Sequence, residues 1–155
     1  MPHILVICTA NICRSPVGEV ILRDRLYKQG LSDWTVASAG TWGLDGHNAS
    51  LYSITIMAEQ GFDLAKHSAQ TITKAMLAEA DLVLCMELGH VEALQAEFPQ
   101  YREKVFALSQ MVDKRYSISD PYGGPIEGFR RMVKEVTSLI DDGLHRIVAL
   151  AESKK

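Results

Sequence analysis

Residues 3–16 read HILVICTANICRSP, and this stretch decides the fold class of the chain. Residues 4–8 are apolar throughout, which is typical of a parallel strand covered on both faces. The dipeptide Ser15-Pro16 predicts the start of a helix, because proline is favoured at the first helical position. A buried strand that leads through a short loop into a helix is the repeating unit of α/β sheets.

The rest of the chain continues this alternation of short apolar runs and longer amphipathic ones. We predict further strands at residues 34–38, 82–86 and 104–108, and helices at residues 15–29, 49–60, 74–80, 88–97 and about 129–148. Residues 109–125 end in a run rich in proline and glycine, which indicates an ordered loop. The predicted fold class is therefore α/β: a single domain, residues 1–155, with a four-stranded, mainly parallel sheet flanked by about five helices on both faces.

Composition and charge exclude several classes of partner. The 155 residues fit one domain, and 47% apolar with 23% charged residues is typical of a globular protein. The net charge of −3 argues against nucleic acid, since proteins that bind phosphate backbones carry a basic face. We expect no membrane partner, because no apolar run approaches the ~20 residues of a membrane helix and the N-terminus lacks signal-peptide features. Three cysteines, with Cys8 and Cys13 close together, do not resemble a disulfide framework, so we predict a reducing, cytoplasmic location.

The loop after the first strand, residues 8–15, carries the candidate chemistry. It lies at the carboxyl end of the predicted sheet, where α/β proteins bind ligands. Backbone N–H groups at a helix N-terminus form a nest for anions, and Arg14 can donate two parallel hydrogen bonds to a phosphate. A thiol on Cys8 that faced this nest would be held as thiolate, and the Ser15 hydroxyl could donate to its sulfur. The other predicted members of this phosphate-binding loop are Thr9, Ala10, Asn11, Ile12 and Cys13.

Other interpretations of these residues remain open on local sequence alone. Cys8 and Cys13 could be small core residues, which is the usual fate of buried cysteines, but their place between a strand and a helix start favours the phosphate loop. Asp120, followed by Pro121 and Tyr122, could supply the proton that a departing alcohol or phenol needs. The same residues also form an ordinary β-turn, which local sequence favours.

The motif Cys-x5-Arg-Ser is the signature of the protein tyrosine phosphatases, and the longer string CTANICRSP at residues 8–16 resembles their low-molecular-weight branch. Further similar segments follow in order over essentially the whole chain, at residues 38–41 (SAGT), 61–67 (GFDLAKH), 86–90 (MELGH) and 120–122 (DPY). The sequence departs from the family pattern at Ala10, where glycine is usual, and at Gln70, where arginine is common. Asn48 and Ser50 replace a further common pattern, and none of these positions is the nucleophile, the arginine or the acid.

The resemblance implies a phosphatase that forms a cysteinyl-phosphate. In that mechanism Cys8 is the nucleophile, Arg14 binds the phosphate, and Asp120 is the general acid and then the general base. Asn11, Ser38 and His67 resemble the family's hydrogen-bonding set that fixes the loop; asparagine also suits a left-handed backbone position. No metal or other cofactor is predicted, and the five histidines are not at ligand spacing.

The predicted partner is a phosphotyrosine-containing protein, and we expect the chain to act as a monomer or weak dimer. We expect Trp42 and Tyr122 to flank the mouth of the pocket, where aromatic faces could sandwich a phosphotyrosine ring. Cys13 lies near enough in sequence for a disulfide with Cys8, which leads to the hypothesis of a reversible redox block.

Three related activities compete with phosphotyrosine hydrolysis. Arsenate reductases of this fold relay through two further cysteines, whereas this chain has only Cys85 outside the loop, which we assign to packing. Phosphoarginine phosphatases tend to carry threonine in place of Ile12, and an apolar residue there better suits an aromatic substrate. A phosphocysteine carrier protein, which holds phosphate without hydrolysis, would not need Arg14 or Asp120.

Overall fold

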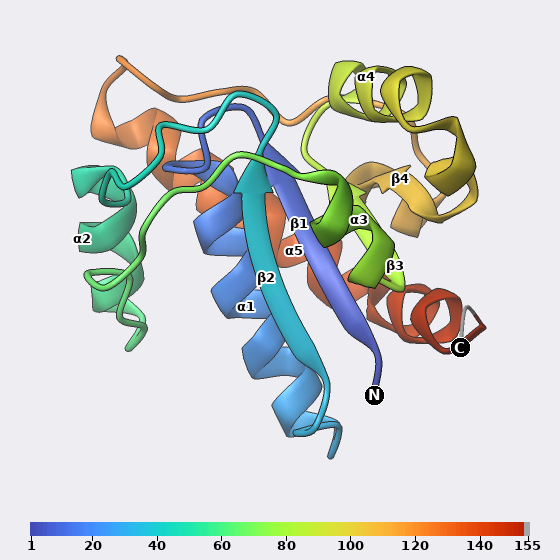
Figure 1. Ribbon diagram of the computed structural model, residues 1–155. Coiled ribbons are helices and arrows are strands. Elements are labelled where there is room, and N and C mark those ends of the chain that lie inside the picture. Colours follow the sequence, from blue (N-terminus) through green and yellow to red (C-terminus); the bar gives the residue numbers. More distant parts are fainter. Residues whose placement is uncertain (154–155) are drawn as a thin grey trace.

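A computed structural model of the protein describes residues 1–153 and shows a parallel sheet between two layers of helices (Figure 1). The strands are β1 (His3–Cys8), β2 (Thr35–Gly40), β3 (Leu82–Cys85) and β4 (Val105–Ala107). They lie in the order β2-β1-β3-β4, and every neighbouring pair is parallel. The predicted α/β class is confirmed, and the sheet is parallel throughout the described residues rather than mainly so.

Helices connect the strands in the part of the chain that the structure describes. The α-helices are α1 (Arg14–Lys28), α2 (Leu51–Glu59), α3 (Lys74–Glu79), α4 (Leu88–Glu97) and α5 (Ile126–Ser153), and two short 3₁₀ helices are η1 (Pro99–Lys104) and η2 (Leu108–Val112). The fourth strand is shorter than predicted, because η1 and η2 take up the residues on both sides of it. For the same reason the segment predicted as a loop, residues 109–125, begins inside a 3₁₀ helix.

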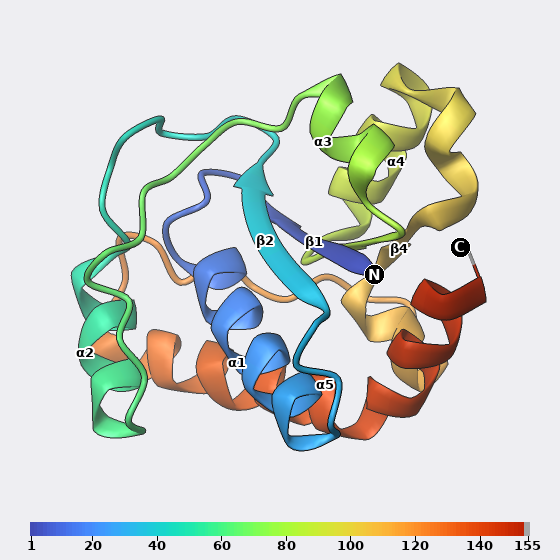
Figure 2. The ribbon, with the colours of Figure 1, turned by 60° about the horizontal axis from the view of Figure 1, so that its bottom comes forward.

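The two faces of the sheet are covered by different helices. Ile4 and Val6 of β1 belong to a core cluster with apolar residues of α1 and α5, whereas Leu5 and Ile7 pack in a second cluster with residues of α3 and α4. Figure 2 shows α1 and α5 on one side of the sheet and α3 and α4 on the other. Because alternate side chains of a strand point to opposite faces, burial on both faces explains why β1 is apolar throughout.

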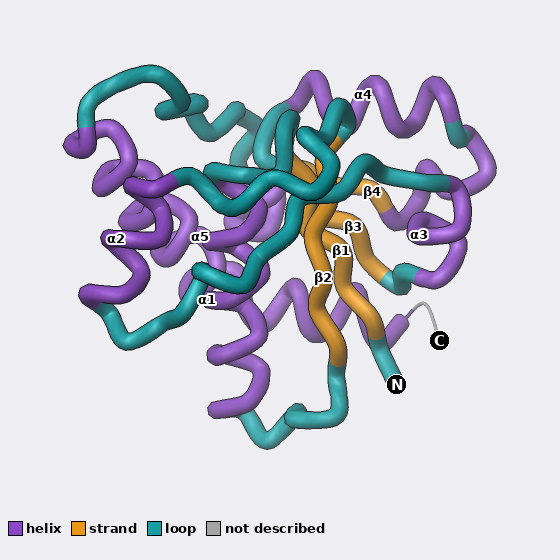
Figure 3. Tube along the Cα trace, turned by 60° about the vertical axis from the view of Figure 1, so that its left-hand side comes forward, coloured by secondary structure: helices purple, strands orange, loops and turns teal. Residues whose placement is uncertain are grey.

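The carboxyl ends of the strands meet at one edge of the sheet, and the connecting loops crowd together above that edge (Figure 3). This arrangement brings the loops after β1 and β2 side by side, as the hydrogen bonds below show. Among residues 1–153, no helix has both the length and the apolar character that crossing a membrane requires.

Candidate active site

The loop after β1 is fastened to the segment that follows β2. The N–H groups of Thr41 and Trp42 donate to the carbonyl oxygens of Cys8 and Thr9, each at 2.9 Å. A Cβ on Gly40 would lie 2.3 Å from the Thr9 carbonyl oxygen, so a larger residue would push the loop away from the strand. The two backbone segments can therefore approach this closely only because residue 40 is glycine.

The conformation of the loop depends on Asn11, which is fully buried and has a φ of 62°. Its side-chain amide donates to the hydroxyls of Ser15 (2.8 Å) and Ser38 (3.0 Å), and its side-chain oxygen accepts from the N–H of Gln70 (2.9 Å). Its backbone carbonyl accepts from Nε2 of His67 at 2.7 Å. The left-handed backbone predicted for Asn11 is confirmed, and Asn11, Ser38 and His67 are brought together.

The structure accommodates the departures from the family pattern at Ala10 and Gln70. Among the described non-glycine residues, positive φ values occur only at Asn11 and Asp113, so the loop position of Ala10 does not require glycine. Gln70 joins the network with its side chain as well, since its amide nitrogen donates to the carbonyl of Ser38 at 2.9 Å. The sequence marks Gln70 only as a departure from the family pattern and gives no sign of this supporting contact.

The carboxylate of Glu19 determines which groups in this network donate hydrogen bonds and which accept them. The hydroxyl of Ser38 donates its one proton to Glu19 at 2.6 Å, so it can only accept from the amide of Asn11. Ser15 also accepts from Asn11, which leaves its own proton for the sulfur of Cys8, 2.9 Å away. The chain of bonds therefore presents a donor to the Cys8 sulfur, and a donor stabilises the thiolate form.

Arg14 is almost fully buried, with 1% of its surface exposed, and its guanidinium group is only partly hydrogen-bonded. Its NH1 donates to the carbonyl of Ile118 and to the carboxylate of Glu87, both at 2.7 Å, and its NH2 lies 3.6 Å from the carboxylate of Asp120. Its Nε is the one buried side-chain nitrogen or oxygen in residues 1–153 without a hydrogen-bond partner. Leaving a buried donor unpaired costs about 1–3 kcal/mol, and an anion that accepts from it would satisfy it.

Arg14 lines a cavity of about 230 Å³. Its wall is formed by Cys8, Thr9, Ala10, Ile12, Cys13, Arg14, Leu44, Asp120 and Tyr122. The predicted nucleophile, phosphate ligand and acid thus face one space, together with Tyr122. An apolar wall with a few convergent polar groups is typical of a small-molecule site.

One predicted residue does not belong to this wall. Trp42 is 80% exposed and is not among the residues that line the cavity, so its place at the pocket mouth beside Tyr122 stays a prediction. Leu44 lines the cavity instead, because its N–H donates to the carbonyl of Ala10 at 3.1 Å and holds it over the loop. Leu44 carries no sequence signal, since its place depends on this contact between two loops.

Asp120 lies in an exposed turn that borders the cavity. The side chain is 46% exposed, and its Oδ1 accepts from the N–H of Tyr122 at 3.1 Å. The N–H of Gly124 donates to the carbonyl of Pro121 at 3.0 Å, which closes a turn. The segment is therefore both the turn that local sequence favours and a wall of the cavity.

The three cysteines are free thiols in different surroundings. Burial, together with the charges of Asp120 and Cys8, raises the pKa of Cys13 to about 12, and burial raises the pKa of Cys85 further. Both stay protonated at neutral pH and are poor nucleophiles. Cys85 is 0% exposed in β3, in agreement with the packing role predicted for it.

The start of α4 supports the loop from the other side. Burial lowers the pKa of His90, so its imidazole is neutral. The N–H of Glu87 donates to Nδ1 of His90 at 3.2 Å, which places the ring proton on Nε2, and Nε2 then donates to the hydroxyl of Thr9 at 2.9 Å. The MELGH match at residues 86–90 pointed to this segment without giving Glu87 or His90 a role.

Known proteins resemble the chain over nearly its whole length. A model of the family described as low molecular weight phosphotyrosine protein phosphatase matches residues 3–153. A probable low molecular weight protein-tyrosine-phosphatase, EpsP of Ralstonia nicotianae, is 34% identical, with 95% of this chain and 97% of that protein covered. A protein-arginine-phosphatase of Geobacillus stearothermophilus is 36% identical over 91% of this chain and 93% of that protein.

A solved structure agrees with these sequence matches. The low molecular weight protein tyrosine phosphatase of T. tengcongensis superposes with a TM-score of 0.89 at 32% identity, covering 94% of this chain and 99% of that one. Cys8 and Arg14 of the Cys-x5-Arg-Ser motif both line the cavity. The chain belongs to the low molecular weight phosphotyrosine protein phosphatase family.

Proposed function

We propose that this enzyme hydrolyses phosphotyrosine in proteins through a cysteinyl-phosphate on Cys8. The observation that carries the proposal is the buried Arg14, whose Nε has no hydrogen-bond partner within residues 1–153 and which lines the same cavity as Cys8 and Asp120. The Nε and NH2 of one guanidinium edge match two oxygens of a phosphate group. With its NH1 already bound to Ile118 and Glu87, the guanidinium is held in place before substrate arrives.

In the first step, the Cys8 thiolate attacks phosphorus in line with the departing oxygen. A P–S bond forms as the P–O bond breaks, and the carboxylic acid of Asp120 gives its proton to the tyrosyl oxygen. Arg14 and the loop N–H groups stabilise the charge on the equatorial oxygens. The product, the free phenol of the tyrosine side chain, then leaves.

In the second step, the ionised Asp120 takes a proton from water, which attacks phosphorus. A P–O bond forms as the P–S bond breaks, and the sulfur leaves as thiolate. The hydroxyl of Ser15, directed toward the sulfur by Asn11, stabilises that leaving group. Inorganic phosphate is released, and the carboxyl group of Asp120 is again protonated.

The cavity wall favours an aromatic phosphate over phosphoarginine. Ile12, Leu44 and Tyr122 give it an apolar rim on which a phenyl ring can pack. Phosphoarginine is the second candidate, because a protein-arginine-phosphatase is among the relatives. Arsenate reduction by a cysteine relay is disfavoured by the full burial of Cys85.

Turnover of p-nitrophenyl phosphate in the presence of a chelator tests the proposal. Cys8→Ser should abolish turnover, whereas Cys85→Ala, at a buried thiol that our mechanism does not use, should retain it. Turnover that survives Cys8→Ser would overturn the mechanism. Phosphotyrosyl and phosphoarginyl peptides of one sequence then decide the substrate, and a higher kcat/KM on the phosphoarginyl peptide would contradict the proposed preference.

A further inference from the structure

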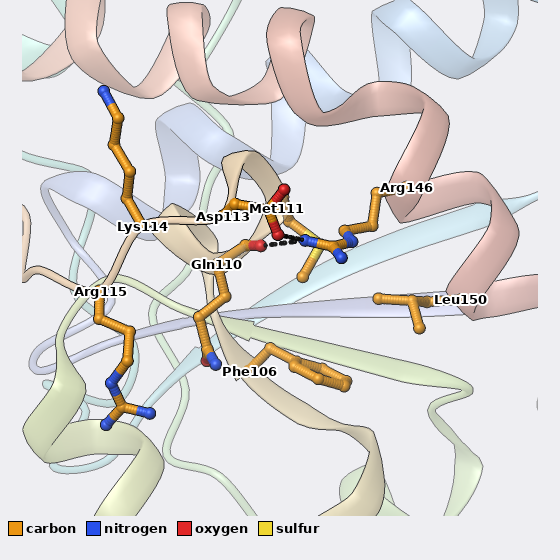
Figure 4. A pocket seen from close by; sticks show the side chains of 8 residues that line it. All are labelled: Phe106, Gln110, Met111, Asp113, Lys114, Arg115, Arg146 and Leu150. Atoms are coloured by element: carbon orange, nitrogen blue, oxygen red, sulfur yellow. Dashed lines mark hydrogen bonds and ion pairs between the residues drawn. The ribbon is translucent and has the colours of Figure 1, made fainter.

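A second cavity, of about 360 Å³, lies between η2 and α5 and shares no lining residue with the catalytic cavity (Figure 4). Its lining residues are Phe106, Gln110, Met111, Asp113, Lys114, Arg115, Arg146 and Leu150. The volume falls within the range of about 300–1,000 Å³ that is usual for small-molecule sites. None of these residues takes part in the proposed reaction.

The frame of this cavity is fixed by close packing. A Cβ on Gly143 of α5 would lie 2.6 Å from Cβ of Met111, so the glycine allows η2 to pack directly on the helix. Nearby on α5, NH1 of Arg146 donates to the carbonyl of Gln110 at 2.9 Å and pairs with the carboxylate of Asp113. Arg146 therefore caps the end of η2, and its charge is partly neutralised by its partner.

The two ends of the cavity differ in character. Figure 4 shows Phe106 and Leu150 on one side of Gln110, and Lys114 and Arg115 on the other. Lys114 and Arg115 are exposed, and the structure shows no ion pair or side-chain hydrogen bond for either within residues 1–153. The lining thus has three cationic residues and one carboxylate, in a chain whose net charge is −3.

We propose that this cavity binds an organic anion, a carboxylate or phosphate attached to a flat or aliphatic apolar body. The body would lie against Phe106, Met111 and Leu150, and the anionic group would pair with Arg115, whose side chain points in the same direction as that of Gln110, whereas Lys114 points the opposite way (Figure 4). Burial of the apolar body against these side chains contributes affinity, and the unpaired positive charge favours an anionic ligand over a neutral one. A local excess of positive charge on an acidic protein concentrates anions at this one place.

An NMR titration of the full chain with 2-naphthoate tests this site and does not depend on turnover. The amide signals of residues 110–115 and 146–150 should shift and saturate. Two further probes separate the requirements: 2-naphthol has the body without the charge, and inorganic phosphate has the charge without the body. Each should bind there at least about tenfold more weakly than 2-naphthoate.

Charge reversal then assigns the anion's partner. The variant Arg115→Glu should weaken 2-naphthoate binding by at least about tenfold. Arg102→Glu is the matched control, because Arg102 is exposed on η1 and does not line the cavity; it should leave affinity within about twofold. Shifts confined to residues 8–15, unchanged affinity in Arg115→Glu, or equal binding of phosphate alone would each overturn the proposal.

Discussion

The phosphate-binding loop, residues 8–15, and the acid loop, residues 118–125, face the same cavity but are held in opposite ways. In the first, Asn11, Arg14 and Ser15 are at most 1% exposed; the side chains of Asn11 and Ser15 bond to each other, and that of Arg14 bonds to Ile118 and Glu87. In the second, the side chain of Asp120 is 46% exposed and Tyr122 is 67% exposed. The acid loop is tied down chiefly at Ile118, whose N–H and carbonyl bond to Met86 and to Arg14.

This contrast separates two tasks in the proposed reaction. The buried loop has to hold a charged phosphate and a thiolate in fixed positions, and prebuilt hydrogen bonds do this without reorganisation. The acid loop has to deliver one proton and let the product leave, for which an exposed turn is suited. Substitutions in the buried loop should therefore affect every substrate, and substitutions in the acid loop should depend on the leaving group.

Arg14→Lys should have the largest effect among the loop variants. Lysine offers a single ammonium group in place of two parallel donors, so it cannot bind a phosphate group in the bidentate way that a planar guanidinium can. We expect kcat/KM to fall by about 10²–10³-fold on all aryl phosphates alike. Arg130→Lys, at an exposed arginine paired with Glu59, is the control and should leave kcat/KM unchanged. A loss that varied strongly with the leaving group would contradict the division of tasks.

Asp120→Asn should give a loss that depends on the substrate. On phosphotyrosine, whose phenol leaves poorly without a proton, kcat should fall by about 10²–10⁴-fold. On p-nitrophenyl phosphate the loss should be much smaller, because nitrophenolate leaves unprotonated. Asp33→Asn changes an exposed aspartate far from the cavity and should affect neither substrate. Equal losses on both substrates would exclude Asp120 as the proton donor.

Ser38→Ala should weaken both stability and turnover by removing the link between Glu19 and Asn11. We expect the free energy of unfolding to fall by about 1–3 kcal/mol, because the amide of Asn11 loses a buried acceptor. Denaturant unfolding gives this value, and kcat should fall with it, because Asn11, which directs the Ser15 proton to sulfur, loses one of the contacts that hold it in place. Ser68→Ala, at an exposed serine, should change neither quantity.

His90→Gln should have the smallest effect, and that effect should depend on pH. Burial lowers the pKa of His90 below its ordinary value of 6.5, so the unfolded chain binds the proton first as pH falls. The stability that the neutral imidazole contributes is therefore fully present above a pH of about 6.5. It is lost as pH falls through the lower pKa of the folded state. The variant should be about 1 kcal/mol less stable at pH 7.5, and the difference should shrink toward pH 5. A difference that grew on acidification would contradict the neutral assignment.

Local sequence predicted those features whose causes are local. The apolar run before Cys8, the Ser15-Pro16 helix start and the left-handed Asn11 follow from burial, from the geometry of proline and from the tolerance of asparagine for positive φ. The motif also placed Asp120 in the site, although local sequence favoured an ordinary turn.

Features that depend on contacts between distant segments could not be predicted in this way. Glu87 meets Arg14 only because β3 lies beside β1, and Leu44 lines the cavity because of one backbone bond to Ala10. The fourth strand is short because its neighbours adopt 3₁₀ turns, which leave no periodic signal in so short a stretch.

Trapping the covalent intermediate tests the central claim most directly. Asp120→Ala, mixed with p-nitrophenyl phosphate and quenched by denaturant, should accumulate phosphoenzyme, because the good leaving group permits the first step while loss of the base slows the second. Mass spectrometry of the digested protein should find one phosphoryl group on the peptide that contains Cys8, and none when Cys8→Ser is added. A phosphoryl group on any other residue, or continued turnover with no phosphoenzyme, would contradict the account.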